Sequence, residues 1–208
     1  MTEVDTETLS HNWWSFLFSC CNTCHTRNKP TSGSKHKPQK LRAVRVIVVG
    51  SPRAGKSRAL ALLSGSPVKD LYNPTGGTET SRIRIGDTAV SLIEVGGGLR
   101  PFWSRAVDNR TNAIWYMLTA EEVSNKDFAT LREFLNEVSA RVSDQHVCVL
   151  VSMFGTLNVS QETANSIISE AFTSSGIYES PIISTISDVS YPSLVASLED
   201  VLTQLASR

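Results

Sequence analysis

The hydrophobic residues of this 208-residue chain fall into short continuous runs that alternate with longer amphipathic stretches. Continuous runs rich in β-branched residues are typical of strands buried on both faces of a sheet. We predict such strands over residues 42–49, 112–119, 146–152 and 181–186. Apolar residues at helical spacing predict helices through residues 59–63, 124–141, 160–174 and 190–206.

A different pattern marks the region after the first predicted helix. Residues 79–85 and 88–95 alternate between apolar and polar positions, and Gly86-Asp87 separates them. This arrangement predicts a β-hairpin. Strands that alternate with helices, with one early hairpin, indicate an α/β fold with a six-stranded, mostly parallel sheet flanked by helices. We expect this domain to cover residues 41–208.

The first 40 residues have another character. Residues 1–25 hold a short amphipathic segment, which is shorter than the ~20 apolar residues needed to span a bilayer. The residues that share its apolar helical face are Leu9, Trp13, Phe16, Leu17, Cys20 and Cys24. Residues 26–40 are rich in Lys, Pro, Ser and Gly, which predicts a flexible basic linker.

Charge is unevenly distributed, although the formal net charge is zero. Residues 1–69 carry eleven Lys and Arg residues against three Asp and Glu residues, and the rest of the chain has the opposite excess. A basic front on an acidic body favours contact with an anionic membrane surface. We expect no nucleic-acid partner, because the basic stretch lacks interleaved aromatic residues and a recognisable reading module. Acidic residues precede the apolar segment, unlike in a secretory signal, so we expect a cytoplasmic location.

The segment Gly50–Ser57 reads GSPRAGKS and matches the pattern G-x-x-x-x-G-K-[ST] of a phosphate-binding loop. In such a loop, backbone N–H groups and the N-terminus of the next helix bind a polyphosphate. Lys56 then reaches the β and γ phosphates, and the Ser57 hydroxyl holds Mg²⁺. A glycine-rich turn without a ligand is the alternative, but the position between a predicted buried strand and a helix favours the phosphate loop. The predicted nucleotide-binding residues of this loop are Gly50, Ser51, Pro52, Arg53, Ala54, Gly55, Lys56, Ser57 and Arg58.

Two later segments resemble the switch regions of Arf-like (ADP-ribosylation-factor-like) small GTPases. Asn73–Gly77 reads NPTGG and is similar to the Pro-Thr-x-Gly of switch I. Glu94–Gly97 reads EVGG and is similar to the Asp-x-Gly-Gly of switch II, and Leu99–Trp103 resembles the sequence that closes switch II. Order and spacing match from about Arg42 to the C-terminus. The chain is thus identified as a divergent member of this family, which implies a Ras-like P-loop GTPase fold.

The resemblance also implies a ligand, a cofactor and partners. The ligand is GTP or GDP, and the cofactor is Mg²⁺. The residues that the resemblance adds to the site are Thr75 as a second Mg²⁺ ligand beside Ser57, Glu94 as a ligand through water, and Gly97 beside the nucleotide. Protein effectors and regulators would meet a monomeric switch of vesicle trafficking through the two switch regions.

Two residues depart from the family pattern at switch II. Glu94 replaces the usual Asp, which it can do if the loop adjusts. Gly98 stands where a glutamine orients the attacking water, and glycine has no side chain for that role. The catalytic residue is therefore unknown, and we expect at most a slow hydrolysis of GTP to GDP.

The guanine-specificity motif is also degraded. The residues aligned with Asn-Lys-x-Asp are 153–156, which read MFGT and lack the Asp that binds the base. Residues 125–127 read NKD, but they lack the spacer residue and are predicted to begin a helix before the fifth strand. The late loop at 184–187 reads STIS and matches the family weakly. Loss of a charged hydrogen-bond partner costs about 1.5–3 kcal/mol, so we expect poor discrimination between GTP and ATP.

Three cysteines, Cys20, Cys21 and Cys24, lie together at the end of the N-terminal apolar segment. Cysteines on an amphipathic helix are candidates for S-palmitoylation, and acyl chains together with a basic linker supply the two signals of stable membrane attachment. The cysteines also match the C-x-x-C-H pattern of haem attachment, but that modification requires export. A zinc site completed by His11 or His36, or a helix that packs on its own domain, are the alternatives.

Together these observations favour a membrane-associated guanine-nucleotide-binding switch at an endomembrane or a cilium. Two other classes of function remain open. The degraded base motif also fits a pseudo-GTPase that serves as a scaffold or binding module. A P-loop kinase or ATPase fits less well, because such proteins are not expected to carry the hairpin and the Pro-Thr-x-Gly segment.

Overall fold

The computed structural model describes residues 43–68, 71–154, 160–177, 180–186 and 190–207. The chain divides into two units, Met1–Gln39 and Lys40–Arg208, and every described residue lies in the second unit. The amphipathic segment, the cysteine cluster and the basic linker predicted for residues 1–40 therefore lie outside the described residues.

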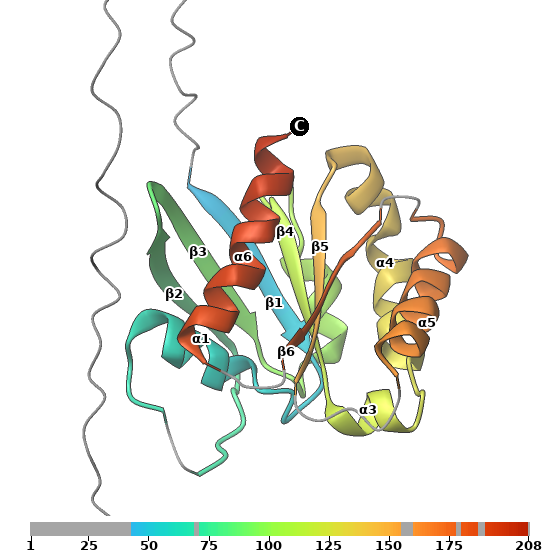
Figure 1. The fold of residues 1–208 in the computed structure, drawn as a ribbon, viewed down its shortest axis with the longest axis horizontal. Helices are drawn as coiled ribbons and strands as arrows, with labels where there is room; N and C mark the ends of the chain where they lie inside the picture. Colours follow the sequence, from blue (N-terminus) through green and yellow to red (C-terminus); the bar gives the residue numbers. More distant parts are fainter. Residues whose placement is uncertain (1–42, 69–70, 155–159, 178–179, 187–189, 208) are drawn as a thin grey trace, which may run out of the picture. The chain divides into compact units, whose positions relative to one another are not determined.

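A six-stranded sheet forms the centre of the described domain, with the strand order β2-β3-β1-β4-β5-β6 (Figure 1). The strands are β1 (Val44–Gly50), β2 (Thr78–Ile85), β3 (Thr88–Val95), β4 (Ala113–Leu118), β5 (Cys148–Phe154) and β6 (Ile182–Ile186). All neighbouring strands pair in parallel except β2 and β3, which form the predicted antiparallel hairpin. The predicted α/β fold is confirmed.

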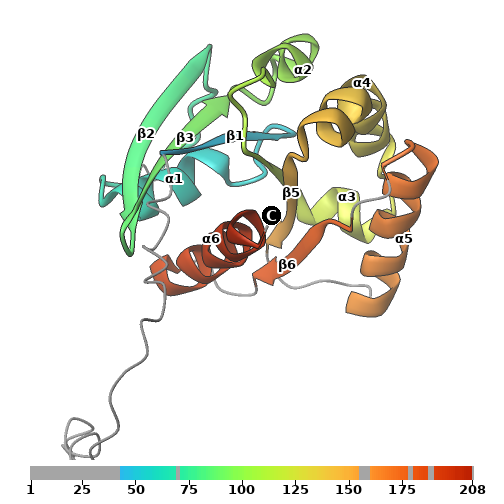
Figure 2. The same ribbon diagram turned by 90° about the horizontal axis from the view of Figure 1, so that it is seen from above.

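Helices cover both faces of the sheet (Figure 2). The helical segments are α1 (Lys56–Ser64), the short 3-10 helix η1 (Arg100–Phe102), α2 (Trp103–Ala106), α3 (Ala120–Ser124), α4 (Ala129–Gln145), α5 (Gln161–Ser174) and α6 (Tyr191–Ala206). Helices α1 and α6 lie side by side on one face, whereas α4 and α5 cover the other face, with α2 beside α4. The sheet is thus the middle of three layers, which is why its central strands are apolar on both sides.

Strand β1 contributes to both hydrophobic cores, because successive side chains of a strand point to opposite faces. Val46 and Val48 belong to the core under α1 and α6. Ile47 and Val49 belong to the core under α4 and α5. Each of these four side chains is at most 1% exposed. Full burial of such a side chain stabilises a fold by about 1.5–3 kcal/mol, so β1 is held firmly at the centre of the sheet. The position of its last residue, Gly50, is fixed with it.

The helix predicted over residues 124–141 corresponds to α4, which begins at Ala129 and ends at Gln145. The short helix α3 before it was not predicted, and residues 125–128 separate the two helices. Helix α3 begins with a capping box, in which Thr119 and Glu122 each accept a hydrogen bond from the other's backbone N–H. Lys126 then has φ 53°, a left-handed conformation that interrupts the helix. The NKD triplet accordingly lies in a connection between helices and not at the start of one.

The sequence pattern did not indicate the helical turns η1 and α2 that follow β3. They bury Trp103, whose ring packs edge-on against Tyr116 and Phe134. The Arg141 guanidinium on α4 donates to the Val107 carbonyl oxygen at 3.0 Å, just after α2 ends. These contacts tie the segment after β3 firmly to the α4 face of the sheet.

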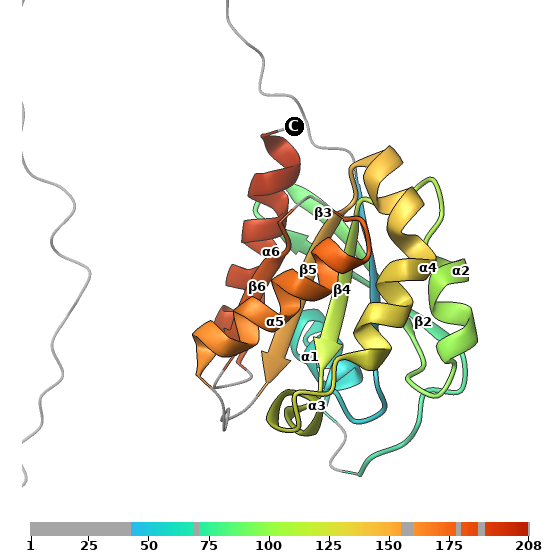
Figure 3. The same cartoon turned by 90° about the vertical axis from the view of Figure 1, so that its right-hand side faces the viewer.

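The carboxyl ends of β1, β4 and β5 lie at one edge of the sheet, and α1 and α3 begin at that edge (Figure 3). Ligands of open α/β sheets bind outside this edge, so we expect the functional site there. None of the described helices combines the length and the apolar character that crossing a bilayer requires.

Candidate functional site

The loop between β1 and α1 follows a path that requires glycine at both ends. Gly50 has φ 139°, and a Cβ there would lie 2.2 Å from the backbone oxygen of Met117 on β4. Gly55 has φ 85° and directly precedes α1. Arg53 between them has φ 65°, which is unusual for a residue with a side chain. Left-handed residues of this kind cluster at ligand-binding sites, so the strained backbone of this loop indicates a functional site.

Lys56 is buried at the start of α1, with 4% of its surface exposed. Its Nζ atom donates to the carbonyl oxygens of Gly50 at 2.8 Å and of Ser51 at 2.9 Å, so the side chain reaches back across the loop. Burial lowers the pKa of Lys56, while the carboxylates of Glu94 and Glu122 oppose that shift. A buried ammonium beside a helix N-terminus is well suited to bind an anion with several oxygen atoms.

Three oxygen-bearing side chains that were predicted to hold a metal come together in the structure. Ser57 Oγ donates to Glu94 Oε1 at 2.7 Å, and Thr75 Oγ1 donates to the same oxygen at 3.1 Å. The two hydroxyl oxygens are 3.3 Å apart. Glu94 is 2% exposed, and its second oxygen, Oε2, is buried without a hydrogen-bond partner in the described part of the chain. Hydroxyl and carboxylate oxygens are ligands that Mg²⁺ prefers, so the cluster fits a divalent cation.

Two glycines bring the end of β3 into close contact with its neighbours. A Cβ at Gly96 would lie 2.1 Å from the Thr75 carbonyl oxygen. A Cβ at Gly97 would lie 2.6 Å from the Pro52 nitrogen in the phosphate loop. By contrast, a Cβ at Gly98 would meet nothing within 4 Å. The first two positions therefore require glycine, whereas the position predicted to lack a water-orienting glutamine has room for a side chain.

The turn after β3 is fixed by hydrogen bonds on both sides of Gly96. The indole Nε1 of Trp103 donates to the Gly96 carbonyl at 3.1 Å. The Gly96 N–H donates to the Gly77 carbonyl at 3.0 Å. One bond joins the turn to the core under α4, and the other joins it to the segment before β2. The buried Trp103 thus supports the backbone that approaches the phosphate loop.

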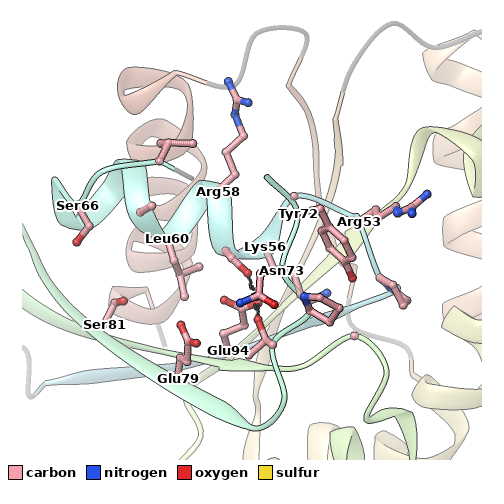
Figure 4. Close-up of a pocket in the computed structure, with 18 of the residues that line it drawn as sticks. Arg53, Lys56, Arg58, Leu60, Ser66, Tyr72, Asn73, Glu79, Ser81 and Glu94 are labelled. Carbon is pink, nitrogen blue, oxygen red and sulfur yellow. Dashed lines mark hydrogen bonds between the residues drawn. The ribbon is translucent and has the colours of Figure 1, made fainter. Parts of the chain in front are cut away.

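A cavity of about 630 Å³ extends from the phosphate loop along α1 to β2 (Figure 4). The predicted site residues that line it are Pro52, Arg53, Gly55, Lys56, Ser57, Arg58, Thr75, Glu94 and Gly97. The predicted loop residues Gly50, Ser51 and Ala54 contribute to the loop without lining the cavity. At the rim, the guanidinium of Arg53 lies 5.4 Å from the ring centre of Tyr72. The structure therefore gathers the predicted phosphate and metal residues around one cavity.

The sequence reasoning missed Glu122. Its Oε1 atom accepts a hydrogen bond from Ser51 Oγ at 2.6 Å, while Oε2 accepts from the Thr119 N–H at 2.7 Å. One carboxylate thus joins the first turn of α3 to the phosphate loop. The Thr-x-x-Glu spacing after a buried strand could have indicated the helix cap, but no local pattern indicates the contact with Ser51 across 71 positions of sequence.

The side expected to read the base is described only in part. Residues 155 and 156 of the degraded motif, and residue 187 of the late loop, lie outside the described residues. Ser184 Oγ is 2.8 Å from Ser197 Oγ on α6, so this hydroxyl is engaged within its own domain. Lys126 of the NKD triplet is exposed in the connection before α4.

Comparison with protein families identifies a match to the family described as the ADP-ribosylation factor family, over residues 32–194. ADP-ribosylation factor-like protein 2 of Drosophila melanogaster is 26% identical over 91 residues, which are 43% of this chain and 49% of that protein. ADP-ribosylation factor-like protein 10 of Mus musculus is 27% identical over 126 residues, which are 58% of this chain and 51% of that protein. The chain thus spans about half the length of the curated relatives that it matches.

A solved structure with a similar fold is described as the Arl6 BBS3 small GTPase from Trypanosoma brucei with bound nucleotide analogue GppNp. The two structures superpose with a TM-score of 0.59 over 80% of this chain and 99% of that chain, at 11% sequence identity. At this level of identity the likeness shows the fold alone. The described domain has the Ras-like small GTPase fold, as the sequence predicted.

Proposed function

The chain belongs to the ADP-ribosylation factor family, and we propose that it is a switch that binds a guanine nucleotide with Mg²⁺. The observation that carries the proposal is the cluster of Ser57, Thr75 and Glu94 beside the buried Lys56, all on one cavity. These side chains come from three separate parts of the chain, and local packing alone does not require their convergence. Their chemistry is that of a site for a polyphosphate and a divalent cation.

Each group has a defined role in this proposal. Backbone N–H groups of residues 51–57 and the N-terminus of α1 bind phosphate oxygens, and Lys56 binds the β and γ oxygens. Ser57 and Thr75 would hold Mg²⁺ through their hydroxyl oxygens, and Glu94 orients both hydroxyls by accepting a hydrogen bond from each. When bound, Mg²⁺ supplies positive charge that neutralises the phosphates. Gly97 lets the turn after β3 approach the loop without a side chain between them.

Two properties of the proposed switch are expected to be weak. With Thr156 in place of the base-binding Asp, discrimination between GTP and ATP is poor. With Gly98 in place of the water-orienting glutamine, hydrolysis of GTP to GDP is slow unless a partner supplies the missing group. A monomer that meets effectors and regulators through its switch regions would then depend on those partners for turnover.

We also propose that residues 1–45 attach the protein to the cytoplasmic side of an endomembrane or ciliary membrane. The support is the apolar face, the three cysteines and the seven Lys and Arg residues from Arg27 to Arg45. Basic residues near an anionic surface contribute up to ~1 kcal/mol each, and acyl chains make the attachment durable.

Replacement of Cys20, Cys21 and Cys24 by Ser tests this attachment in cells. We expect the variant to lose both its thioester-linked acyl groups in an acyl-exchange assay and its place in the membrane fraction. Membrane retention of the variant, together with wild type free of acyl groups, would leave the cysteines to a different role such as zinc binding.

A pseudo-GTPase that acts as a scaffold is the second candidate. The observation that favours it is the combination of Gly98 at the water-orienting position with the missing base-binding Asp. Such a module would keep the fold and the switch surfaces while binding nucleotide weakly or not at all.

Titration of a fluorescent GTP analogue separates the two candidates. Lys56→Ala should reduce affinity at least about a hundredfold, because it removes the buried cation of the phosphate site. Lys126→Ala is the matched control, since Lys126 is exposed in the connection before α4 and does not line the cavity; it should bind like wild type. If wild type shows no binding at millimolar nucleotide, or if Lys56→Ala binds equally well, the switch proposal fails and the scaffold is favoured.

A further inference from the structure

Two glutamates face each other across the hairpin of β2 and β3. Glu79 on β2 is the register partner of Glu94 on β3. Directly opposed residues of an antiparallel pair lie on the same face of a sheet, with their Cβ atoms about 4.5–5.5 Å apart. Both glutamates line the cavity beside the phosphate loop (Figure 4). This closeness follows from the pairing of the two strands and does not depend on the conformation of a loop.

The two carboxylates lack a counter-charge of their own. Like charges placed opposite each other destabilise a pair of strands. Neither glutamate forms an ion pair within the described residues. Burial lowers the pKa of Lys56 and the charge of Glu94 opposes that shift, so these two groups are near each other. The Nζ atom, however, donates to two carbonyl oxygens of the phosphate loop, and a single ammonium offsets at most one of the two negative charges.

One oxygen of Glu94 indicates independently that a ligand binds here. Its Oε1 atom accepts hydrogen bonds from the hydroxyls of Ser57 and Thr75. Its Oε2 atom is buried and has no hydrogen-bond partner among the described residues, and the whole side chain is 2% exposed. A buried carboxylate oxygen without a partner is unfavourable and rare in folded proteins. A cation bound at Oε2 would supply the missing partner.

Glu79 adds what such a cation requires. The residue is exposed and lines the cavity, so an ion can reach it from solvent. Carboxylate and hydroxyl oxygens are the ligands that Mg²⁺, Ca²⁺ and Mn²⁺ prefer, and the number of charged ligands tunes the affinity of such sites. With Glu79 the site has two negative charges, whereas the metal residues predicted from the sequence supply only one.

We propose that Glu79 is a further residue of the cation site and that, together with Glu94, it holds a divalent cation before any nucleotide binds. The hydroxyls of Ser57 and Thr75 lie beside Glu94 and add two oxygen atoms to the set of ligands. The cation site itself is independent of the proposed switch, while its use in nucleotide binding rests on that proposed function.

The proposal has a consequence for the phosphates. Without a cation, two carboxylates face the incoming polyphosphate and repel it, whereas a bound cation offsets their charge. Nucleotide affinity should therefore depend more steeply on divalent cations than in a site with one carboxylate. Removal of the Glu79 charge should weaken cation binding but ease nucleotide binding in the absence of metal. Structural damage at Glu79 would instead weaken both.

Titration of the nucleotide-free, full-length protein with Mn²⁺ tests the site, with free Mn²⁺ measured by electron paramagnetic resonance. We expect Glu79→Gln, which removes the charge and keeps the shape, to bind Mn²⁺ at least about tenfold more weakly than wild type. The matched control is Glu121→Gln, because Glu121 is exposed and does not line the cavity. It should bind like wild type. Equal affinity of wild type and Glu79→Gln, an equal loss in the control, or no binding by wild type at millimolar Mn²⁺ would overturn the proposal.

Thermal unfolding of the same nucleotide-free proteins separates charge from structure. Added Mg²⁺ should raise the midpoint of wild type and of Glu121→Gln, because a ligand that binds the folded state stabilises it, and should raise that of Glu79→Gln much less. In chelator, Glu79→Gln should unfold no earlier than wild type, since the pair of like charges is gone. A lower midpoint of Glu79→Gln in chelator would show a structural role of Glu79 and contradict the proposal.

The last measurement addresses the nucleotide. A fluorescent GTP analogue is titrated with Mg²⁺ and with chelator, and the ratio of the two affinities is compared between proteins. The ratio should be at least about tenfold smaller in Glu79→Gln than in wild type, and an unchanged ratio would contradict the role of Glu79 toward the phosphates. Normal Mn²⁺ binding by a wild type that binds no nucleotide would support the cation site and overturn the proposed switch.

Discussion

The phosphate side and the base side of the proposed nucleotide site differ in how well their residues match the groups expected to bind the ligand. On the phosphate side, the buried Lys56 donates to the Gly50 carbonyl at 2.8 Å, and Ser57 donates to the buried Glu94 at 2.7 Å. Glycine is required where the backbone after β3 meets its neighbours. On the base side, the residues aligned with the specificity motif read MFGT, and the Ser184 hydroxyl is engaged with α6. We infer that the two halves of nucleotide recognition can diverge independently, because separate segments of the chain are predicted to supply them.

The largest effect on nucleotide affinity is expected when one methyl group is added on the phosphate side. Gly97→Ala places a Cβ 2.6 Å from the Pro52 nitrogen, so either the turn after β3 or the phosphate loop must move. We expect nucleotide affinity to fall at least about a hundredfold, measured by titration of a fluorescent analogue. Gly98→Ala is the control, because a Cβ there meets nothing within 4 Å, and it should bind like wild type. Similar losses in both variants would show that the close approach at Gly97 is not what matters.

On the base side, the corresponding test is to restore the carboxylate that the specificity motif lacks. Thr156→Asp should raise the preference for GTP over ATP about 10- to 150-fold, the range expected for one charged hydrogen bond. Competition assays with both nucleotides measure the ratio, and Thr156→Asn, which lacks the charge, is the matched control. A wild-type preference for GTP above roughly a thousandfold would show that another residue reads the base. The alignment of the fifth strand would then be wrong.

A smaller effect is expected at Glu122, which joins α3 to the phosphate loop. Glu122→Ala removes the acceptor for Ser51 and half of the capping box, so the free energy of unfolding should fall by about 1–2 kcal/mol. Nucleotide affinity should fall only a few-fold, since the phosphate-binding groups themselves remain. Chemical denaturation and nucleotide titration measure the two effects. Glu121→Ala, next to it in the same first turn, is exposed and should change neither; an equal loss there would remove the assigned role of Glu122.

The sequence sufficed for those parts of the fold and site that depend on local pattern. The β-branched run of β1 and the glycine spacing of the phosphate loop each follow from backbone rules that act within a few residues. The pattern missed α3 and placed the start of α4 five residues early, because the left-handed backbone at Lys126 lies in a connection that separates the two helices. It also missed Glu122, whose contact with Ser51 joins residues far apart in the chain. The roles of Thr75 and Glu94 could be predicted only from the resemblance to the family, since neither residue has a local sequence signature of its own.

The fluorescence of Trp103 can report on the turn after β3, because its indole donates a hydrogen bond to the Gly96 carbonyl. Trp115 lies in the opposite core, where its indole donates to Ser152 Oγ at 2.8 Å, away from the turn after β3. Both indoles are at most 1% exposed, so their emission depends on local structure rather than on bulk solvent. With Trp13 and Trp14 changed to Phe, the remaining two indoles form a signal and a reference. Motion of the turn after β3 then becomes visible as a change in emission from Trp103 against a constant background, without any attached dye.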